Sequence, residues 1–261
     1  MNIKHLKSSL SAFLGCVGFS AALVGCGGGG GSSDPGVTTL PTVNLQGIWT
    51  GTIGSDAASA VVLSDGKAWL IANSAPTKLY TAALQGGSAS YSASGKQYTS
   101  GVAGAVNIAV VTTSVSSKAT LSGNVTPTGG VATAYNFSYQ SRYEVPATLA
   151  ALSGTWRGTQ AGGNLVVEWL INAAGALSQT SNNSNGCSYS GNVAVHNLPS
   201  PVGVYDLSLR ESCTALGATK VKDFQGIATL DTSNSKATFA FSRSDAGFEG
   251  TEAYVQPTTK Q

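Results

Sequence analysis

Two segments of this chain repeat one another at a distance that fits one small domain per copy. Residues 45–52 read LQGIWTGT and residues 152–159 read LSGTWRGT, so five of the eight positions are identical. The copies begin at positions 45 and 152, 107 residues apart, and about 100 residues is a common size for one domain. Each copy continues into an apolar run, a glycine-containing turn and a second apolar run. A duplicated domain is therefore the first constraint on the fold.

Short strand-like segments recur along both copies. Apolar residues alternate with others in several of them, for example at Leu165, Val167, Trp169 and Ile171, and this period predicts a strand with one buried face. The expected strands lie near 46–53, 58–63, 67–72, 79–84, 88–93, 106–113, 117–124 and 131–139, and near 153–160, 163–171, 175–180, 185–195, 202–210, 221–230, 235–242 and 247–255. We expect an all-β fold of two tandem small antiparallel β-barrels with about eight strands each, because closure removes exposed strand edges. A β-sandwich is the alternative.

The N-terminal segment predicts export and lipid attachment. A basic start with Lys4 and Lys7 precedes an apolar run too short to span a bilayer as a helix, and Leu-Val-Gly-Cys follows at 23–26. This pattern matches a bacterial lipoprotein signal peptide, with Cys26 as the first residue of the mature chain, carrying acyl chains such as palmitate. An ordinary secretory signal and cleavage at Cys16 are the alternatives.

The residue after Cys26 is Gly27 rather than aspartate, which resembles lipoproteins that are sent on to the outer membrane. The expected location is therefore the outer membrane, lipid-anchored, with the folded part facing the periplasm or the cell surface. The expected parts of the chain are a signal peptide at 1–25, the lipidated cysteine with a flexible Gly-rich tether at 26–43, a first barrel repeat at 44–145, a connector at 146–152 and a second barrel repeat at 153–257.

The charge of the mature chain argues against one class of partner. Without Lys4 and Lys7 the 14 basic residues become 12, which equals the 12 acidic residues, so the net charge is near zero. The sequence has no basic stripe, so a nucleic-acid partner is not expected. The expected partners are the membrane, through Cys26, and an unknown protein or a small apolar molecule.

Two cysteines, Cys187 and Cys213, follow Cys26 in the mature chain. In an oxidising compartment a structural disulfide between them is the expected state. A redox-active pair is the alternative, but such pairs more often have the Cys-X-X-Cys spacing. A metal pair would need further ligands nearby.

The sequence offers few groups for catalysis or metal binding. His196 is the one histidine after the signal peptide, so a Ser-His-Asp triad has a single possible base, and no serine lies in a Gly-X-Ser-X-Gly segment. Glu168 stands beside Trp169, but alternation places their side chains on opposite faces of a strand. Glu249 and Glu252 are expected to be solvated. We therefore expect no enzyme activity, no cofactor and no metal site.

Aromatic residues give the one positive indication of binding. Tyr135, Phe137 and Tyr139 alternate along one expected strand and share its face. Together with Trp49 and Trp156 they are the candidate lining of a ligand site. The core of a small barrel needs the same kinds of residue, so ligand binding and core packing both stay open.

The starts of the two copies resemble a known family. Gly-Ile-Trp at 47–49 and Gly-Thr-Trp at 154–156 resemble the Gly-X-Trp signature of lipocalin-type barrels. The resemblance implies that each tryptophan packs across the closed end of its barrel, beneath a basic side chain from the last strand. Lys118 or Arg142 would supply this side chain in the first copy, and Arg243 would supply it in the second.

A second resemblance is to uncharacterised repeat-bearing outer-membrane lipoproteins of proteobacteria. It rests on NGCSYSG at 185–191, on VYDL at 204–207 and on Cys213, which follows them. This resemblance implies a location, a β-fold and the disulfide, and it implies no established activity.

The sequence therefore predicts a non-catalytic, membrane-anchored lipoprotein that acts as a surface or periplasmic interaction module. The alternative is a lipocalin-like carrier that holds a small apolar molecule inside one barrel. A hydrolase comes third, because the mature chain has a single histidine. A buried apolar cavity would favour the carrier, and an exposed aromatic patch would favour the interaction module.

Overall fold

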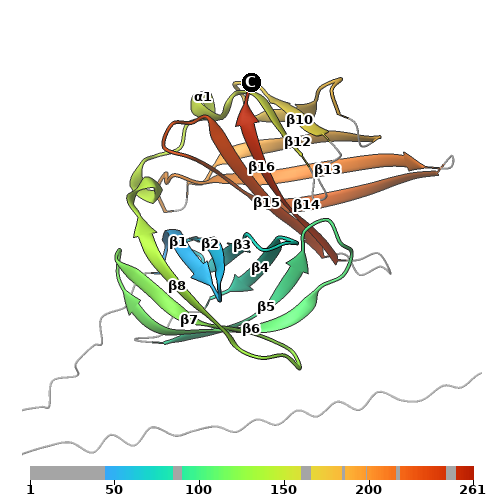
Figure 1. The fold of residues 1–261 in the computed structure, drawn as a ribbon. Helices are drawn as coiled ribbons and strands as arrows, with labels where there is room; N and C mark the ends of the chain where they lie inside the picture. Colours follow the sequence, from blue (N-terminus) through green and yellow to red (C-terminus); the bar gives the residue numbers. More distant parts are fainter. Residues whose placement is uncertain are drawn as a thin grey trace, which may run out of the picture. The chain divides into compact units, whose positions relative to one another are not determined.

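Sixteen β-strands build two closed barrels, each with eight antiparallel strands (Figure 1). The computed structural model describes residues 45–84, 90–159, 166–183, 186–197, 199–215, 218–244 and 251–261, so the signal peptide, Cys26 and the tether expected from the sequence lie outside the described residues. The prediction of two tandem small antiparallel barrels is confirmed, and the alternative of a sandwich is wrong. Within the described ranges, no helix has the length and apolar character needed to cross a membrane.

In the first barrel each strand pairs with the next one along the chain, and the last strand pairs with the first. The strands are β1 (Gly47–Ile53), β2 (Asp56–Val62), β3 (Lys67–Ala72), β4 (Lys78–Ala83), β5 (Tyr91–Thr99), β6 (Val106–Ser116), β7 (Thr120–Pro127) and β8 (Thr133–Gln140). Closure joins β1 to β8, with Ile48 opposite Gln140 at one end and Ile53 opposite Tyr135 at the other. This ladder leaves neither strand with a free edge along its length.

The second barrel repeats this strand order. Its strands are β9 (Gly154–Thr159), β10 (Val166–Ile171), β11 (Ala176–Gln179), β12 (Cys187–Val195), β13 (Tyr205–Ala215), β14 (Ala218–Leu230), β15 (Lys236–Ser244) and β16 (Thr251–Lys260). The closing ladder is short here, because Thr259 and Lys260 are the residues of β16 that pair with β9 in the described part of the chain. The side chain of Gln256 continues the seam by donating to the carbonyl oxygen of Thr159 (3.1 Å).

The observed strands lie at the sixteen expected positions, and the differences concern where they begin and end. Strand β5 is expected near 88–93 and spans Tyr91–Thr99, and β6, β13 and β14 are longer than expected. A hairpin ladder continues for as long as both partners can pair, and alternation along one strand does not mark where its partner ends. Strand existence was therefore easier to predict than strand length.

A short connector leads from β8 to β9. It contains a 3-10 turn, η1 (Ser141–Glu144), and one α-helical turn, α1 (Leu149–Leu152). Thr148 caps α1, since its Oγ1 accepts a hydrogen bond from the backbone N–H of Ala151 (3.2 Å). Oxygen-bearing side chains at this position stabilise a helix start, which explains why so short a helical turn forms here.

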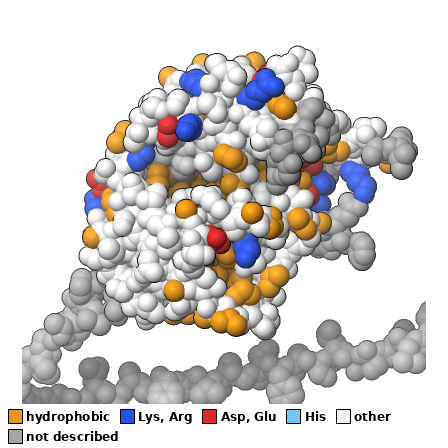
Figure 2. Space-filling model, in the orientation of Figure 1, with side chains coloured by type: hydrophobic (Ala, Val, Ile, Leu, Met, Phe, Trp, Pro, Cys, Tyr) orange, Lys and Arg blue, Asp and Glu red, His pale blue; other side chains and the backbone are white. Residues whose placement is uncertain are grey.

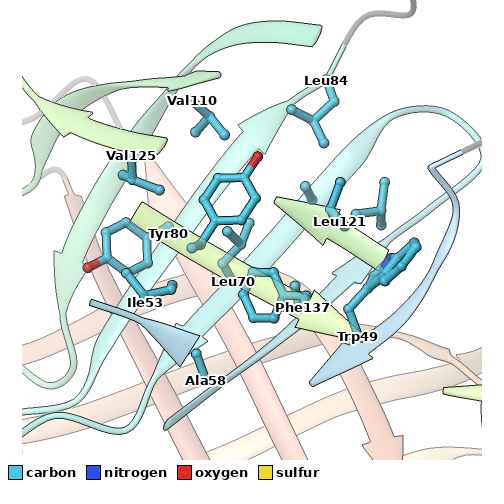
Figure 3. Packing of buried hydrophobic residues seen from close by; sticks show 14 of the residues in the cluster. Trp49, Ile53, Ala58, Leu70, Tyr80, Leu84, Val110, Leu121, Val125 and Phe137 are labelled. Carbon is cyan, nitrogen blue, oxygen red and sulfur yellow. The ribbon is translucent and has the colours of Figure 1, made fainter. Parts of the chain in front are cut away.

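Apolar side chains that alternate along the strands fill the interior of the first barrel (Figure 3). Trp49, Leu70, Tyr80, Val110 and Phe137 all belong to this core, and each is at most 5% exposed. Successive residues of a strand point to opposite faces, so one set forms the core and the other faces outward. The alternation that indicates strands in the sequence is thus the alternation between interior and exterior.

The interior of the second barrel is rich in aromatic rings. Trp156, Trp169, Phe224 and Phe239 are at most 1% exposed. Trp169 meets Phe239 edge-on, with ring centroids 5.1 Å apart, which is a favourable geometry for two rings. This aromatic core occupies the middle of the barrel.

A third apolar cluster joins the two barrels. Leu79, from the outer face of the first barrel, belongs to the same cluster as Val204 and Ile227 of the second, and all three are at most 2% exposed. Backbone groups meet there too, since the N–H of Gly101 donates to the carbonyl oxygen of Ala253 on β16 (2.9 Å). Both barrels therefore belong to one compact unit.

Candidate functional site

The candidate lining residues on β8 share one strand face, as expected. Tyr135 and Phe137 are 2% and 3% exposed, and the Tyr135 hydroxyl lies 2.7 Å from Oγ1 of the buried Thr112. Tyr139 is partly buried and meets Trp49 edge-on, with ring centroids 5.3 Å apart. These rings pack against one another and against neighbouring apolar side chains, which is the arrangement of a close-packed core.

Trp49 and Trp156 occupy equivalent places at the start of the first strand of each barrel. The indole N–H of each donates to a carbonyl oxygen four residues earlier, that of Leu45 (3.2 Å) and that of Leu152 (2.6 Å). The Nζ of Lys260 lies 5.4 Å from the centroid of the Trp156 ring, within cation–π range. A basic side chain from the last strand therefore does contact Trp156, and it belongs to Lys260.

The basic residues expected in this role contact other groups. Arg243 lies on β15 at the end of the barrel away from Trp156, where its Nε is 3.4 Å from Glu252 Oε2, so the expectation for Arg243 is wrong. In the first barrel, Lys118 forms an ion pair with Glu144, and Arg142 donates a hydrogen bond to a side chain of the second barrel. Sequence order alone does not reveal which end of a strand reaches a given ring.

Charged and phenolic side chains gather inside the second barrel at the end opposite to α1. We call this group the ionic cluster, and it consists of Tyr189, Glu211, Lys222, Arg243, Glu252 and Tyr254. The cluster draws on β12, β13, β14, β15 and β16. On β13, Leu207 and Leu209 precede Glu211 at alternate positions, and all three are buried. Every second residue of β13 points into the barrel, so the inward position that follows the last leucine is occupied by a charged residue.

Lys222 lies between the two carboxylates of the ionic cluster. Its Nζ is 2.8 Å from Glu252 Oε2 and 3.5 Å from Glu211 Oε1. The hydroxyl of Tyr254 donates to Glu252 Oε1 (2.5 Å), and the hydroxyl of Tyr189 donates to Glu211 Oε2 (2.8 Å). Each carboxylate therefore has a phenol at one oxygen and the ammonium of Lys222 at the other.

The ionic cluster keeps ionised groups almost out of water. Glu211 and Glu252 are 4% and 6% exposed, whereas the side chain of Lys222 is 19% exposed. Burial alone would raise the pKa of Glu252, but the hydrogen bonds from Lys222 and Tyr254 and the charge of Arg243 outweigh burial, so this pKa is lowered. Burial and the adjacent Glu252 raise the pKa of Tyr254, which keeps this phenol a hydrogen-bond donor.

The first barrel shows that a barrel of this type closes without buried charges. Among the described residues of the first barrel, the buried polar ones are Ser100 and Thr112, and neither carries a charge. Both barrels have the same strand order. A buried ion-pair network adds little net stability once desolvation is included. The ionic cluster is therefore the strongest candidate for a functional site.

The expectation that Glu252 is solvated is wrong. It lies two residues before Tyr254 on β16, at an inward position. Glu249, which was expected to be solvated as well, lies outside the described residues. Sequence reasoning missed Glu211 and Lys222 because it treats charged residues as outward. The signal that identifies them is the continuation of the inward alternation beyond the last apolar residue of each strand.

The predicted disulfide between Cys187 and Cys213 is confirmed. The two cysteines lie directly opposite one another on β12 and β13, with Cα atoms 4.1 Å apart. Together with Glu211 they form the group of potential metal ligands found among the described residues, with ligand atoms within 4.8 Å of one another. A cysteine binds a metal as its thiolate, so the disulfide leaves the carboxylate of Glu211 as the one group of this set able to bind a metal.

His196 pairs with an acid, as the base of a catalytic triad would. It is 4% exposed, and its Nδ1 lies 3.0 Å from Asp206 Oδ1. The base of a triad also needs a nucleophile's hydroxyl at the other ring nitrogen, and Nε2 of His196 has no hydrogen-bond partner in the described part of the chain. The pair therefore does not form a triad with the described residues.

Glu168 and Trp169 lie on opposite faces of β10, as alternation predicts. Trp169 belongs to the core. Glu168 lies on the outer face of β10 but is 4% exposed, because Thr180 and Asn182 cover it and donate to its Oε1 at 2.6 Å and 2.7 Å. The Thr180 hydrogen bond is the main cause of a lowered pKa at Glu168; burial opposes this shift, and the Asn182 bond reinforces it. The two side chains do not converge on one site.

A cavity of about 280 Å³ at the junction of the barrels is lined by residues of both. Tyr139, Tyr143, Lys118 and Glu144 contribute from the first barrel and its connector, and Val202 contributes from the second. Burial raises the pKa of Tyr143 to about 12, and the charge of Asp65 adds to this shift. This cavity is more exposed than the ionic cluster, since the side chain of Lys118 is 63% exposed.

No family model, curated protein or solved structure matches this chain. The resemblance to lipocalin-type barrels stays a prediction that these comparisons do not test.

Proposed function

We propose that this protein is a non-catalytic lipoprotein, anchored through Cys26, that presents a double barrel as an interaction module at the outer membrane. The signal-peptide pattern that ends at Cys26 supports the anchor. The partner we propose is another protein of the cell envelope, contacted from the periplasmic or surface side.

The observation that carries this proposal is the packed apolar core that the described residues form inside each barrel. Trp49, Trp156, Trp169 and Phe239 are among the largest side chains that are less than 2% exposed. An eight-stranded barrel is narrow enough for its own side chains to fill. A barrel filled in this way offers its outer faces and its ends for binding.

The apolar cluster between the barrels supports a module of fixed shape. Leu79 and Val204 are both 0% exposed in this cluster. A rigid surface loses less conformational entropy when it binds a partner. Figure 2 shows one face of the protein, on which a few charged side chains lie scattered among uncharged and apolar ones. Such a face suits contact with a protein better than contact with a polyanion.

The alternative function, a lipocalin-like carrier, is favoured by one observation, the ionic cluster. Glu211 and Glu252 lie at one end of the aromatic core of the second barrel, each with a phenol and Lys222 at its oxygens. A ligand bound at this end would need a charged or polar group beside its apolar part. The carrier hypothesis therefore changes from an apolar ligand to an amphipathic one.

Native mass spectrometry of the protein gently extracted from its own membrane distinguishes the two functions. The interaction module predicts the mass of the lipidated chain, alone or with a second protein. A discrete small-molecule mass that heating removes would contradict the module and support the carrier. The matched control is the same sample after heating and organic extraction, which defines the mass of the empty lipoprotein.

A further inference from the structure

We infer that the cavity at the junction of the barrels binds a small neutral ring with adjacent hydroxyl groups, as in a monosaccharide, and that Tyr143 and Glu144 recognise these hydroxyls. The cavity is lined by the turn between β6 and β7, the end of β8, η1 and the segment between β12 and β13, so the cores inside the barrels do not need to open. The inference goes beyond the proposed function, since it assigns a ligand class to a site that the interaction module does not require.

Backbone hydrogen bonds hold the two sides of this cavity together. The N–H of Gly203 donates to the carbonyl oxygen of Tyr143 (2.8 Å), and the N–H of Ala147 donates to the carbonyl oxygen of Val202 (2.9 Å). The chain segments approach so closely that a Cβ on Gly203 would lie 2.2 Å from the carbonyl oxygen of Arg142. The cavity is therefore formed before a ligand arrives, which lowers the entropy cost of binding.

The phenol of Tyr143 is the observation that points to a ligand. Tyr143 lines the cavity and is 4% exposed, and its hydroxyl has no hydrogen-bond partner among the residues that the structure describes. A buried hydroxyl without a partner costs free energy. A ligand hydroxyl can donate to this phenol or accept from it, whereas a purely apolar ligand would leave it unpaired. Burial raises the pKa of Tyr143 to about 12, so the phenol keeps its proton near neutral pH.

A carboxylate and an ammonium face the same cavity at its outer rim. Glu144 and Lys118 both line the cavity and form an ion pair, and their side chains are 47% and 63% exposed. Lys118 and the hydroxyl of Tyr139 (3.3 Å) both contact Oε1 of Glu144, so Oε2 can accept from a ligand. The ammonium of Lys118 has three N–H donors and can share one with a ligand. Two adjacent hydroxyls match this pair, because one donates to the carboxylate and the other accepts from the ammonium.

The charge of the lining favours a neutral ligand. Lys118 and Glu144 are the charged residues of the described lining, one of each sign. A ligand with a single charge would be attracted by one and repelled by the other, whereas a hydroxyl can bind either. The ring of Tyr139 and the side chain of Val202 also line the cavity and can contact the C–H groups of a sugar ring.

The size of the cavity limits the ligand to about one ring. Its volume of about 280 Å³ is just below the range of about 300–1,000 Å³ that is typical of sites for drug-sized molecules. A single sugar ring is smaller than such molecules. A free monosaccharide and the terminal ring of a glycan share this chemistry, and the glycan would extend past the exposed rim.

The test is a ligand-detected NMR titration of the full-length lipoprotein in a detergent without a sugar headgroup. The probes are glucose, galactose and mannose, each as the free sugar and as its methyl glycoside. Tetrahydropyran, which has the same ring without hydroxyls, is the control ligand. At least one sugar is expected to bind saturably, and tetrahydropyran is expected not to bind. No saturable binding of any sugar, or equal binding of tetrahydropyran, would overturn the inference.

The two forms of each sugar distinguish the two sources of the ligand. A methyl glycoside that binds as well as its free sugar supports the terminal ring of a glycan, because the linking oxygen then points out of the cavity. A free sugar that binds more tightly than its glycoside supports a monosaccharide. Both results support the site.

Tyr143→Phe tests the phenol as a recognition group. This variant is expected to bind the sugar about fivefold more weakly, the effect of one hydrogen bond. Its thermal midpoint is expected not to fall, because the hydroxyl has no partner to lose among the described residues. Tyr80→Phe is the matched control, since it removes a phenol hydroxyl from the core of the first barrel, and it is expected to bind like the wild type. Unchanged affinity in Tyr143→Phe would overturn the inference.

Glu144→Gln tests the carboxylate. The variant is expected to lose about tenfold in affinity, because hydrogen bonds to a charged acceptor are stronger than those to an amide. Asp223→Asn is the matched control, since it removes the carboxylate of an exposed ion pair with Arg210. A Glu144→Gln variant that binds like this control would contradict the assignment.

The sugar test and the test of the proposed function are independent. The rim residues Lys118 and Glu144 are exposed to water, so the sugar is expected to bind weakly and to leave during extraction from the membrane. Mass spectrometry of the extracted protein therefore decides between the interaction module and the carrier whatever the sugar titration shows.

Discussion

The indole N–H of Trp156 donates a hydrogen bond of 2.6 Å to the carbonyl oxygen of Leu152, four residues earlier in the chain. Trp49 makes the same contact with Leu45, at 3.2 Å. Leucine and tryptophan are two of the positions at which the repeated segments agree. The repeat in the sequence is therefore also a repeat in the structure. In each barrel, the tryptophan of the first strand binds the segment that precedes this strand through the indole hydrogen bond.

This shared contact predicts that each barrel loses a similar and large part of its stability when its tryptophan is replaced. Both rings are 0% exposed, so Trp49→Ala and Trp156→Ala are each expected to lower the free energy of unfolding by about 3–5 kcal/mol. Equilibrium denaturant unfolding measures this loss, with Val131→Ala as the control at a position that is 86% exposed. Unchanged stability together with lost partner binding would show that the tryptophan is a recognition residue.

The sequence was informative about strands and much less so about the candidate site. Alternation such as that of Leu207 and Leu209 reports a buried face, and both are buried. Alternation does not report that Glu211 continues the same face, because a charged residue is ordinarily assigned to solvent. The contact between Lys260 and Trp156 was missed for another reason, since it depends on how β16 registers with β9 across the barrel closure.

The disulfide is expected to stabilise the second barrel. Cys187 and Cys213 are separated by 26 positions, and closing a loop of this length contributes about 3.5 kcal/mol in the chain-entropy model. The double variant Cys187→Ser, Cys213→Ser is therefore expected to lose about this amount in denaturant unfolding. Wild-type protein kept free of reductant is the control, and a double variant of wild-type stability would show that the bridge contributes nothing.

Glu168 is expected to make stability depend on pH in the acid range. Its pKa in the folded state is below the ordinary value of 4.5, mainly through the Thr180 hydrogen bond. The folded state therefore binds the proton less readily than the unfolded state, and the stabilisation is present above pH 4.5 and is lost as the pH falls through the lowered pKa. Glu168→Gln should be less stable than the wild type at pH 7, and the difference should shrink below pH 4.5.

Thermal unfolding of both proteins between pH 7 and pH 3 tests this account of Glu168. Asp223→Asn is the control. The Arg210 hydrogen bond lowers the pKa of Asp223 too, but both side chains are more than half exposed, so water screens the pair and its effect on stability is expected to change much less with pH. A stability difference between Glu168→Gln and the wild type that stays constant down to pH 3 would contradict it.

The apolar cluster between the barrels is expected to couple their unfolding. Leu79 points out of the first barrel into this cluster and is 0% exposed. Leu79→Ala should cost about 2–5 kcal/mol and should separate one thermal transition into two, because the cores inside the barrels are untouched. Leu170→Ala, at a position that is 44% exposed, is the control. A variant that still unfolds in a single transition at the wild-type temperature would show that the barrels are not coupled through Leu79.

Detecting the lipid anchor at Cys26 tests most directly the proposal that this protein is a membrane-anchored module. The measurement is the intact mass and the membrane partition of the wild type and of Cys26→Ala, both expressed from the full-length chain. We predict that the wild type sediments with membranes and has the mass of a chain that begins at Cys26 with its acyl groups, and that Cys26→Ala is released from the membrane. Cys26→Ala that stays with the membrane, or wild-type protein with the mass of an unmodified chain, would contradict the account.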